Sequence, residues 1–323
     1  PIIEDTLFFF AAYEKFESPQ VLEYGAGGST AGANKTTVTA DEVAKVKEIA
    51  NRVYGLSDIG NFDTQPLLED EKYIIKLDWN INDDHRANFV YMFNEGNDTR
   101  NMTSSDRELR LDSHWYNKFE ELNNFSVKLF SDWTDEFSSE ISVTQKSVET
   151  GQVSLNGGLG IGDVTIQNID EDNDGNSGSI AFGSDAFRHS NSLSNDLTIL
   201  KFDGSYLFDE HQLDFGIDYK ILKVENQFLP NSKGTITFAS LEDFENRMVA
   251  QYVYENGVGN DPLKVAANFE RNDLALYVND TWDIADDLTL TFGVRYERFS
   301  SDDKPAYNQD LFDRTGYDNT FNL

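Results

Sequence analysis

Residues 211–221 read His-Gln-Leu-Asp-Phe-Gly-Ile-Asp-Tyr-Lys-Ile, and this stretch decides the fold. Successive side chains of a β-strand point to opposite faces, so the stretch predicts one apolar and one polar face. The same alternation recurs along much of the chain, usually in pairs of segments joined by a short acidic turn. Such strands predict a sheet whose apolar face meets lipid and whose polar face meets water. In 211–221 the apolar face carries Leu213, Phe215, Ile217, Tyr219 and Ile221, and the polar face carries Gln212, Asp214, Gly216, Asp218 and Lys220.

The composition excludes several classes of protein. Of the 323 residues, 58 are acidic and 26 are basic, and the net charge of -32 leaves no basic surface for nucleic acid. The mean hydropathy is -0.53, and no apolar run approaches the roughly 20 residues that a membrane helix needs. Aromatic residues make up 13% of the chain, which argues against wholesale disorder. The absence of cysteine excludes a disulfide scaffold and thiolate metal sites.

Alternation and turn signals predict nine strands, near 7–16, 73–81, 87–93, 125–133, 137–146, 200–208, 211–221, 274–284 and 288–299. Short turns lie near 82–85, 134–136, 209–210 and 285–287, whereas long loops fill 17–70, 95–112, 148–195 and 224–270. Short turns at one end and long loops at the other are typical of an outer-membrane barrel. We therefore predict an all-β fold, namely part of an antiparallel transmembrane β-barrel with long extracellular loops.

Three tryptophans, Trp79, Trp133 and Trp282, lie within a few residues of a short turn. An aromatic girdle at the membrane interface is expected at this position. The alternative is that the three rings cap a small soluble core.

Two of the long loops contain helix signals. Thr39-Ala-Asp-Glu42 forms a capping box ahead of an apolar stripe that ends at Gly55. Ser240-Leu-Glu-Asp243 opens a second helix. We expect both helices to pack the loops onto the barrel rim, and a helix that binds a partner is the alternative. The second stripe consists of Leu241, Phe244, Met248 and Tyr252.

Several stretches of the chain form a set when they are taken in order. The first is Pro1-Ile-Ile-Glu-Asp-Thr-Leu-Phe-Phe-Phe10, with Tyr13-Glu14 after it. The others are Lys76-Leu-Asp-Trp-Asn-Ile-Asn-Asp-Asp-His85, Phe182-Gly-Ser-Asp-Ala-Phe-Arg-His189, Tyr277-Val-Asn-Asp-Thr-Trp282, Thr289-Leu-Thr-Phe-Gly-Val-Arg-Tyr296 and Asp302-Asp-Lys-Pro305. In this order, the stretches resemble the Oar-like TonB-dependent receptors.

The resemblance implies an active transporter of the bacterial outer membrane. Such receptors have a roughly 22-stranded barrel with a plugged lumen, and a coupling segment that engages TonB. Residues 1–323 show nine strands and neither a plug nor a coupling segment. An open sheet would expose two unpaired edges to lipid. We therefore expect a central piece of a larger polypeptide or one part of an assembled barrel, in contact with outer-membrane lipid and, through a missing N-terminal region, with TonB.

An acidic run, Asp170-Glu-Asp172-Asn-Asp174-Gly175, places carboxylates at alternate positions ahead of a glycine. This is the first half of a calcium loop of the EF-hand type, so Asp170, Asp172 and Asp174 are candidate calcium ligands. The twelfth position is Ala181 instead of glutamate, and flanking helix signals are absent. A solvated acidic loop is the alternative. A calorimetric titration without heat at millimolar calcium would argue against the metal site.

Other motifs of catalysis or cofactor binding are weak, so we predict no enzymatic activity. The four histidines, His85, His114, His189 and His211, are scattered, and we interpret them as surface or turn residues rather than metal ligands. The run Gly157-Gly-Leu-Gly-Ile-Gly162 lacks a following helix or a nearby basic residue, which favours a flexible loop over a phosphate site. No G-x-S-x-G motif and no cysteine nucleophile occur.

Charged residues of the polar face either line a substrate path or hydrogen-bond a plug or one another. They include Asp78, Lys128, Glu140, Lys146, Asp214, Asp218, Lys220, Arg295 and Glu297. The net charge of -32 favours capture of cationic or metal-bearing solutes by the long loops, within a screening length of roughly 8 Å. Equal uptake of cationic and anionic analogues would remove the basis for this expectation. The solute itself is unknown.

Two alternatives remain open. One is a secreted or surface-attached acidic β-protein that binds calcium or glycans and packs its apolar strand faces in a sandwich. The other is a passive porin, which differs from the transporter in lacking the plug. Apolar faces on nearly every strand and the unequal loops favour the barrel over the sandwich.

Overall fold

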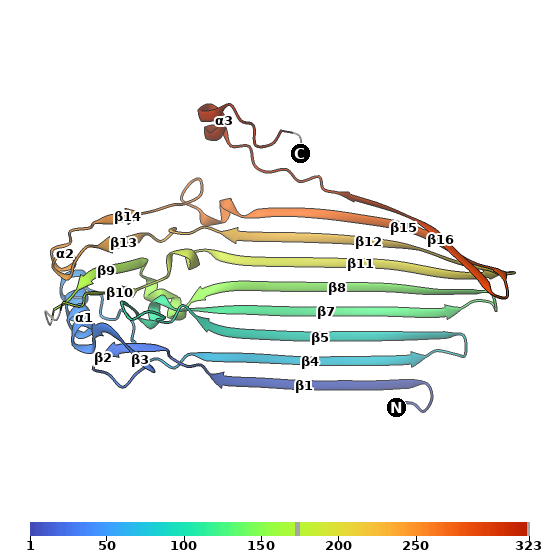
Figure 1. The fold of residues 1–323 in the computed structure, drawn as a ribbon, viewed down its shortest axis with the longest axis horizontal. Coiled ribbons are helices and arrows are strands. Elements are labelled where there is room, and N and C mark those ends of the chain that lie inside the picture. The colour runs from blue at the N-terminus through green and yellow to red at the C-terminus, as the bar shows by residue number, and fades with distance from the viewer. Residues whose placement is uncertain (172–174, 322–323) are drawn as a thin grey trace.

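Nine long strands form one antiparallel sheet in the computed structural model, which describes residues 1–171 and 175–321 (Figure 1). The order of the strands in the sheet is their order in the chain, so the strands are the nine that the alternation predicts. They are β1 (Leu7–Pro19), β4 (Leu67–Asn80), β5 (His85–Arg100), β7 (Tyr116–Asp132), β8 (Phe137–Ser154), β11 (Asn191–Phe208), β12 (His211–Phe228), β15 (Ala267–Ala285) and β16 (Leu288–Ser300).

Short turns join the strands at one end of the sheet, on the right in Figure 1. They connect β4 to β5, β7 to β8, β11 to β12 and β15 to β16, as predicted. The strands contain 13 to 19 residues and run further than the sequence pattern indicates. The long connections are therefore shorter than the predicted loops 17–70, 95–112, 148–195 and 224–270.

At Gly204 and Gly216 of the sheet, the missing side chain makes room for an aromatic ring of the neighbouring strand. A Cβ atom at Gly216 would lie 2.7 Å from the ring of Tyr277, and one at Gly204 would lie 2.7 Å from the ring of Phe215. Each ring covers the glycine that is its partner in the adjacent strand. Glycine within a strand generally weakens the strand. In these two pairs its missing side chain allows an aromatic ring to pack closely across the strands.

The long connections form a second folded part, which we call the cap (residues 20–66, 101–115, 155–190 and 229–266). It contains a five-stranded mixed sheet in the order β14-β13-β9-β10-β6 and a two-stranded sheet of β2 and β3. These strands lie at the left end of the molecule in Figure 1, and the sequence analysis missed them. Their bounds are β2 (Tyr24–Gly27), β3 (Asn34–Thr39), β6 (Glu108–Arg110), β9 (Asp163–Ile169), β10 (Gly178–Phe182), β13 (Thr235–Phe238) and β14 (Gln251–Val253).

The two predicted helices are present in the cap. α1 (Ala40–Tyr54) has the capping box between Thr39 and Glu42 and ends at Gly55, whose φ is 72°. α2 (Leu241–Asn246) is shorter than predicted, because Arg247 ends it ahead of Met248. A third helix, α3 (Gln309–Thr315), follows β16. The short 3-10 helices are η1 (Asp112–His114), η2 (Leu155–Gly160), η3 (Ala186–Arg188) and η4 (Pro262–Val265). Within 1–171 and 175–321, none of the helices has the length and apolar character that crossing a membrane requires.

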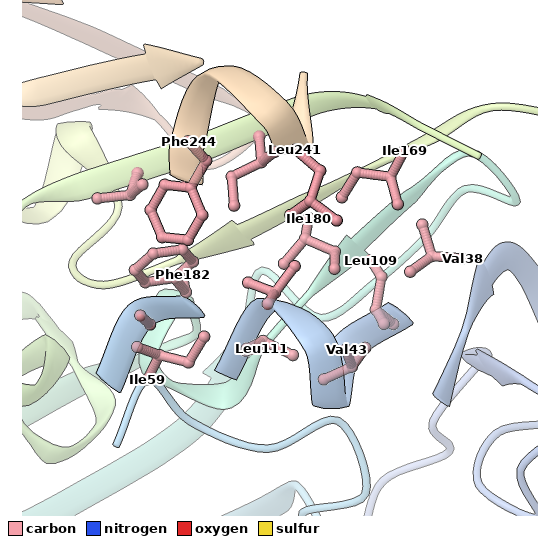
Figure 2. Close-up of a cluster of buried hydrophobic side chains, with 14 of the residues drawn as sticks. Val38, Val43, Ile59, Leu109, Leu111, Ile169, Ile180, Phe182, Leu241 and Phe244 are labelled. Atoms are coloured by element: carbon pink, nitrogen blue, oxygen red, sulfur yellow. The ribbon is translucent and has the colours of Figure 1, made fainter. Parts of the chain in front are cut away.

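The large cluster of buried hydrophobic side chains lies in the cap (Figure 2). Phe244 and Leu241 of α2 lie on one side of it, Val43 of α1 lies on the other, and Ile180 and Phe182 of β10 lie between them. The expectation that both helices pack on the barrel rim is therefore wrong. Their apolar stripes pack on a core that the cap itself provides, since the short cap strands supply the apolar partners.

Candidate membrane wall and its concave face

One row of apolar side chains crosses all nine strands of the large sheet. Residues that are paired across neighbouring strands lie on the same face of the sheet. The strand register alone therefore identifies the members of the row, and their solvent exposure is not needed. Every member of the row is apolar or aromatic, which is what a surface in contact with lipid requires. The row consists of Leu7, Trp79, Ala87, Leu129, Ile141, Phe202, Ile217, Leu276 and Tyr296.

The neighbouring row, one residue along each strand, lies on the opposite face and is mostly polar. Its members are Phe8, Asp78, Asn88, Lys128, Ser142, Lys201, Asp218, Ala275 and Glu297. Because the side chains alternate with period two, the two rows fix the identity of both faces along every strand. The apolar and polar faces predicted for residues 211–221 agree with these two rows, which contain Ile217 and Asp218 respectively.

Aromatic residues border the apolar face at both ends. Trp79, Trp133 and Trp282 are exposed near the short turns, and the ring of Trp282 stacks on His211 with 5.1 Å between the ring centres. The opposite border carries tyrosines whose hydroxyl groups reach polar side chains. Tyr13 donates to Glu71 Oε1 at 3.2 Å, Tyr91 to Asn123 Oδ1 at 2.7 Å and Tyr219 to Asn272 Oδ1 at 3.0 Å. An apolar band between two aromatic girdles is the outer surface of a transmembrane barrel.

The height of the apolar band fits a membrane. On β15 the band runs from Leu274 to Trp282, which covers about 27 Å along the strand at ~3.4 Å per residue. At the tilt of about 35–45° that barrel strands adopt, this length spans roughly 20 Å of the membrane, slightly less than the usual apolar band of about 25 Å. The strands continue beyond the tyrosine border toward the cap, so the wall extends past the band on that side.

Nothing in the described parts of the chain, 1–171 and 175–321, packs on the apolar face as a second sheet would. The hydrophobic core cluster there belongs to the cap, and side chains such as Phe292 and Val294 stay exposed. The sandwich that the acidic binding protein would need is therefore not the observed fold. In the same described ranges, Trp79, Trp133 and Trp282 lie outside the buried core cluster.

The polar face is the concave face. A cavity of about 890 Å³ lies against it and is bounded by residues 5 and 6, ahead of β1, and by residues from β4 to β15. Its acidic side chains outnumber the basic ones, among which is Arg86, whose guanidinium lies 4.5 Å from the ring centre of Phe130. A concave surface of one sign of charge raises the local concentration of counter-ions. The carboxylates of the cavity are Asp5, Asp83, Asp84, Asp132, Glu140, Asp203 and Asp214.

Many of the charged residues predicted for the polar face form ion pairs with each other. Lys128 Nζ lies 2.7 Å from Glu140 Oε1, and Arg295 Nε lies 2.6 Å from Glu297 Oε1. The pair of Lys220 with Asp218 is longer, at 3.4 Å. All of these pairs are partly open to solvent, so each adds little to stability. They neutralise the basic side chains locally, which leaves the acidic excess of the cavity.

The first strands depart from the polar pattern on the concave face. Phe8 and Phe10 of β1 lie on this face, in register with Asp78 and Lys76 of β4. An adjacent cross-strand row joins Ala12, Ile74 and Met92. β1 therefore carries apolar side chains on both faces of the sheet. Strands of this kind are normally covered by other protein or lipid on both faces.

Two of the four histidines occupy positions that the sequence analysis did not predict. His85 and His211 begin β5 and β12 directly after short turns, as expected. His114 and His189, in contrast, are only 5% and 7% exposed, so the interpretation of all four as surface or turn residues is wrong. Both lie where the cap joins the sheet. The burial of both histidines depends on segments that are distant in the sequence. His189 is the last residue of the stretch 182–189 that the sequence analysis quoted, but that stretch alone does not reveal its burial.

The predicted calcium ligands are only partly covered by the structure. Asp170 follows β9, whereas Asp172 and Asp174 lie outside the described residues. In the described parts of the chain, no group of three or more His, Asp or Glu side chains could hold a metal ion. The run Gly157–Gly162 begins within η2, where Asn156 to Leu159 adopt left-handed backbone angles. The calcium site stays a prediction.

Comparisons with known proteins agree with this geometry. A sequence model of the family described as outer membrane beta barrel domain matches residues 29–322. The outer membrane transporter YddB from Escherichia coli has a similar structure, with a TM-score of 0.57 and 10% sequence identity; the match covers 92% of this chain and 32% of that one. The FrpB iron transporter from Neisseria meningitidis (F5-1 variant) is similar with a TM-score of 0.50 and 13% identity, over 93% of this chain and 37% of that one.

These structural similarities show a shared fold, and the chain spans about a third of the length of either transporter. No curated protein sequence matches the chain. The family match covers most of the sequence, including eight of the nine strands of the sheet. The apolar row therefore contacts the lipid of the outer membrane, and the chain belongs to the outer membrane beta barrel domain family.

Proposed function

We propose that residues 1–323 form part of the wall of a TonB-dependent transporter, which moves a bulky solute through a plugged channel. The apolar patch on the concave face carries this proposal. Phe8, Phe10, Ile74 and Met92 would face water in an open pore, where exposed apolar area is unfavourable. A protein segment packed in the lumen would cover them. This argues for a plugged channel and against a passive porin.

The edges of the sheet support a larger barrel. In the described part of the chain, β1 pairs only with β4 and β16 pairs only with β15. Each of these two strands therefore has one edge of backbone N–H and C=O groups without a strand partner. Such edges are not stable in lipid, because hydrocarbon offers no hydrogen bonds. We infer that further strands pair with β1 and β16, so that residues 1–323 are a partial barrel domain of the receptor.

The acidic cavity supports a cationic or metal-bearing solute. The carboxylates on the concave face would raise the local concentration of cations along the wall. The long connections, at the other end of the strands, would make the first contact with the solute. The solute would pass along the concave side of the wall. No enzymatic step is proposed.

The test uses the native protein purified from outer membranes and inserted into a planar lipid bilayer. A plugged transporter is expected to give no steady ion current, because the lumen is filled. In the same membranes, cross-linking is expected to join the protein to TonB. The native polypeptide is also expected to be far heavier than the 36.6 kDa of residues 1–323.

A steady single-channel current from the native protein would contradict the plug and support the passive porin. If the protein gives no current and also does not cross-link to TonB, the proposal that TonB is its coupling partner is contradicted. A control bilayer with a known open porin establishes that current is detectable under the same conditions.

A further inference from the structure

His189 joins two connections of the chain at the place where the cap meets the sheet. Its Nε2 atom lies 2.9 Å from the carbonyl oxygen of Ser184, and its Nδ1 atom lies 3.1 Å from the backbone nitrogen of Lys233. A carbonyl oxygen can only accept and a backbone N–H can only donate. The imidazole is therefore neutral, with its proton on Nε2, and Nδ1 accepts the hydrogen bond from Lys233.

The segments joined by His189 are far apart in the sequence. His189 precedes the barrel strand β11, and Lys233 lies in the connection between β12 and the cap strand β13. Two backbone bonds lie beside the imidazole, from Leu229 N to Ser190 O at 2.9 Å and from Asn231 N to Ala186 O at 3.1 Å. The ring adds a side-chain link to these two backbone hydrogen bonds between the connection and the segment ahead of β11.

The charged and titratable groups around His189 come from every neighbouring segment. Asp185 and Arg188, from the turn that includes η3, form an ion pair at 3.0 Å. Asp163, at the start of β9, accepts a hydrogen bond from the backbone of Ala186 at 3.0 Å and lies 3.3 Å from the other buried histidine, His114. The side chain of Lys233 adds a positive charge. The carboxylates are thus engaged by these other partners.

A second proton on His189 would break one of its bonds. Protonated Nδ1 carries a hydrogen that points at the N–H of Lys233, so two donors would face each other. Burial lowers the pKa of His189, and the charge of Lys233 adds to this effect, whereas the carbonyl of Ser184 and the carboxylates of Asp163 and Asp185 act in the opposite direction.

The sign of the pH effect follows from linkage. In the open or unfolded state the imidazole has its ordinary pKa of about 6.5. The folded pKa is lower, so the open state binds more protons between these two values. The closed cap is therefore most stable above about pH 6.5 and loses stability as the pH falls through the interval below it.

We propose that His189 is a pH-sensitive latch, which holds the connection between β12 and β13 to the start of β11 at neutral pH and releases it in acid. The part of the cap that this release loosens is residues 229–238, the connection that leads into β13 together with that strand, while α2 stays packed on the cap core. The latch is independent of the proposed transport function, since it depends only on the contacts of the cap.

The experiment measures hydrogen–deuterium exchange of the full chain in lipid vesicles at pH 7.5 and pH 5.5, after correction for the intrinsic change of the exchange rate. Protection of residues 233–238 is expected to fall several-fold, up to about tenfold, which is the limit for one proton over this interval. His189→Gln is the central variant, because glutamine can accept from Lys233 and donate to Ser184 without titrating. His211→Gln is the matched control, since it makes the same replacement in the barrel, at the start of β12 and away from the cap.

The expected result is that His189→Gln keeps its protection at both pH values, whereas His211→Gln behaves like the unaltered chain. Full pH dependence in His189→Gln would overturn the proposal. If that variant is already unprotected at pH 7.5, nitrogen NMR of the histidine-labelled chain decides the matter. The latch requires the neutral Nε2–H form at pH 7.5 and protonation together with the loss of protection. The proposal would be overturned if His189 became protonated while residues 233–238 kept their protection. It would also be overturned if these residues lost protection while His189 stayed neutral.

Discussion

Replacement of Val278 by arginine is expected to lower the free energy of unfolding in lipid vesicles by about 2–4 kcal/mol, the cost of a basic side chain at the middle of a lipid-facing barrel surface. Val278 lies on the apolar face of β15, midway along the band from Leu274 to Trp282, and is 43% exposed. Its partners across the strands are Phe215 and Val294. Lipid is therefore the medium that the arginine would enter. Urea titration followed by tryptophan fluorescence measures the change.

The matched control is Asn279→Arg, one residue further along the same strand. Asn279 lies on the concave face opposite Asp214, where a positive charge would meet carboxylates and water. We expect a change within about 0.5 kcal/mol, as for most substitutions away from packed or buried features. If both variants lose the same stability, the two faces of the sheet do not meet different media, and the membrane assignment of the apolar row is wrong.

Replacement of Phe182 by alanine is expected to destabilise the cap by about 3–5 kcal/mol, the usual loss for a buried aromatic ring. Phe182 is fully buried in the cap core, where its ring meets Phe244 edge-on at 6.2 Å between the ring centres. The surrounding side chains of the core would relax only partly into the space left behind. Hydrogen exchange of β9 and β10 in the lipid-embedded chain measures the loss.

Phe187→Ala is the control, because Phe187 is the same type of residue in the same segment but is 54% exposed. Its expected effect is within about 0.5 kcal/mol. Exchange in the middle of the barrel strands should change in neither variant, since the core cluster is confined to the cap. Unaltered protection of β10 in Phe182→Ala would mean that the cap does not depend on this core.

The two faces of the wall follow from the sequence because the signal is local. Leu213 and Phe215, or Asp214 and Asp218, are separated by two or four residues, and a strand places such residues on one face whatever surrounds it. The acidic turns and the capping box of Thr39 and Glu42 are equally local. Which face is concave is not local, because curvature arises from the twist of all nine strands together.

The cap sheet shows the opposite case. β9 and β13 pair in parallel although Val164 and Ile236 are 72 residues apart, and strands of three to seven residues give too few alternations to be distinguished from a loop. The burial of His189 has the same origin, since its partner Lys233 lies 44 residues further on.

The sequence alone thus determined the number of barrel strands, their short turns, the apolar and polar faces and the helix α1. Only the tertiary structure decided that the long connections fold into a cap, that α1 and α2 pack on its core, and that two histidines are buried. The physical reason is the range of the interactions. Side-chain alternation and capping act over two to four residues, whereas a core and a cross-chain hydrogen bond exist only after distant segments have met.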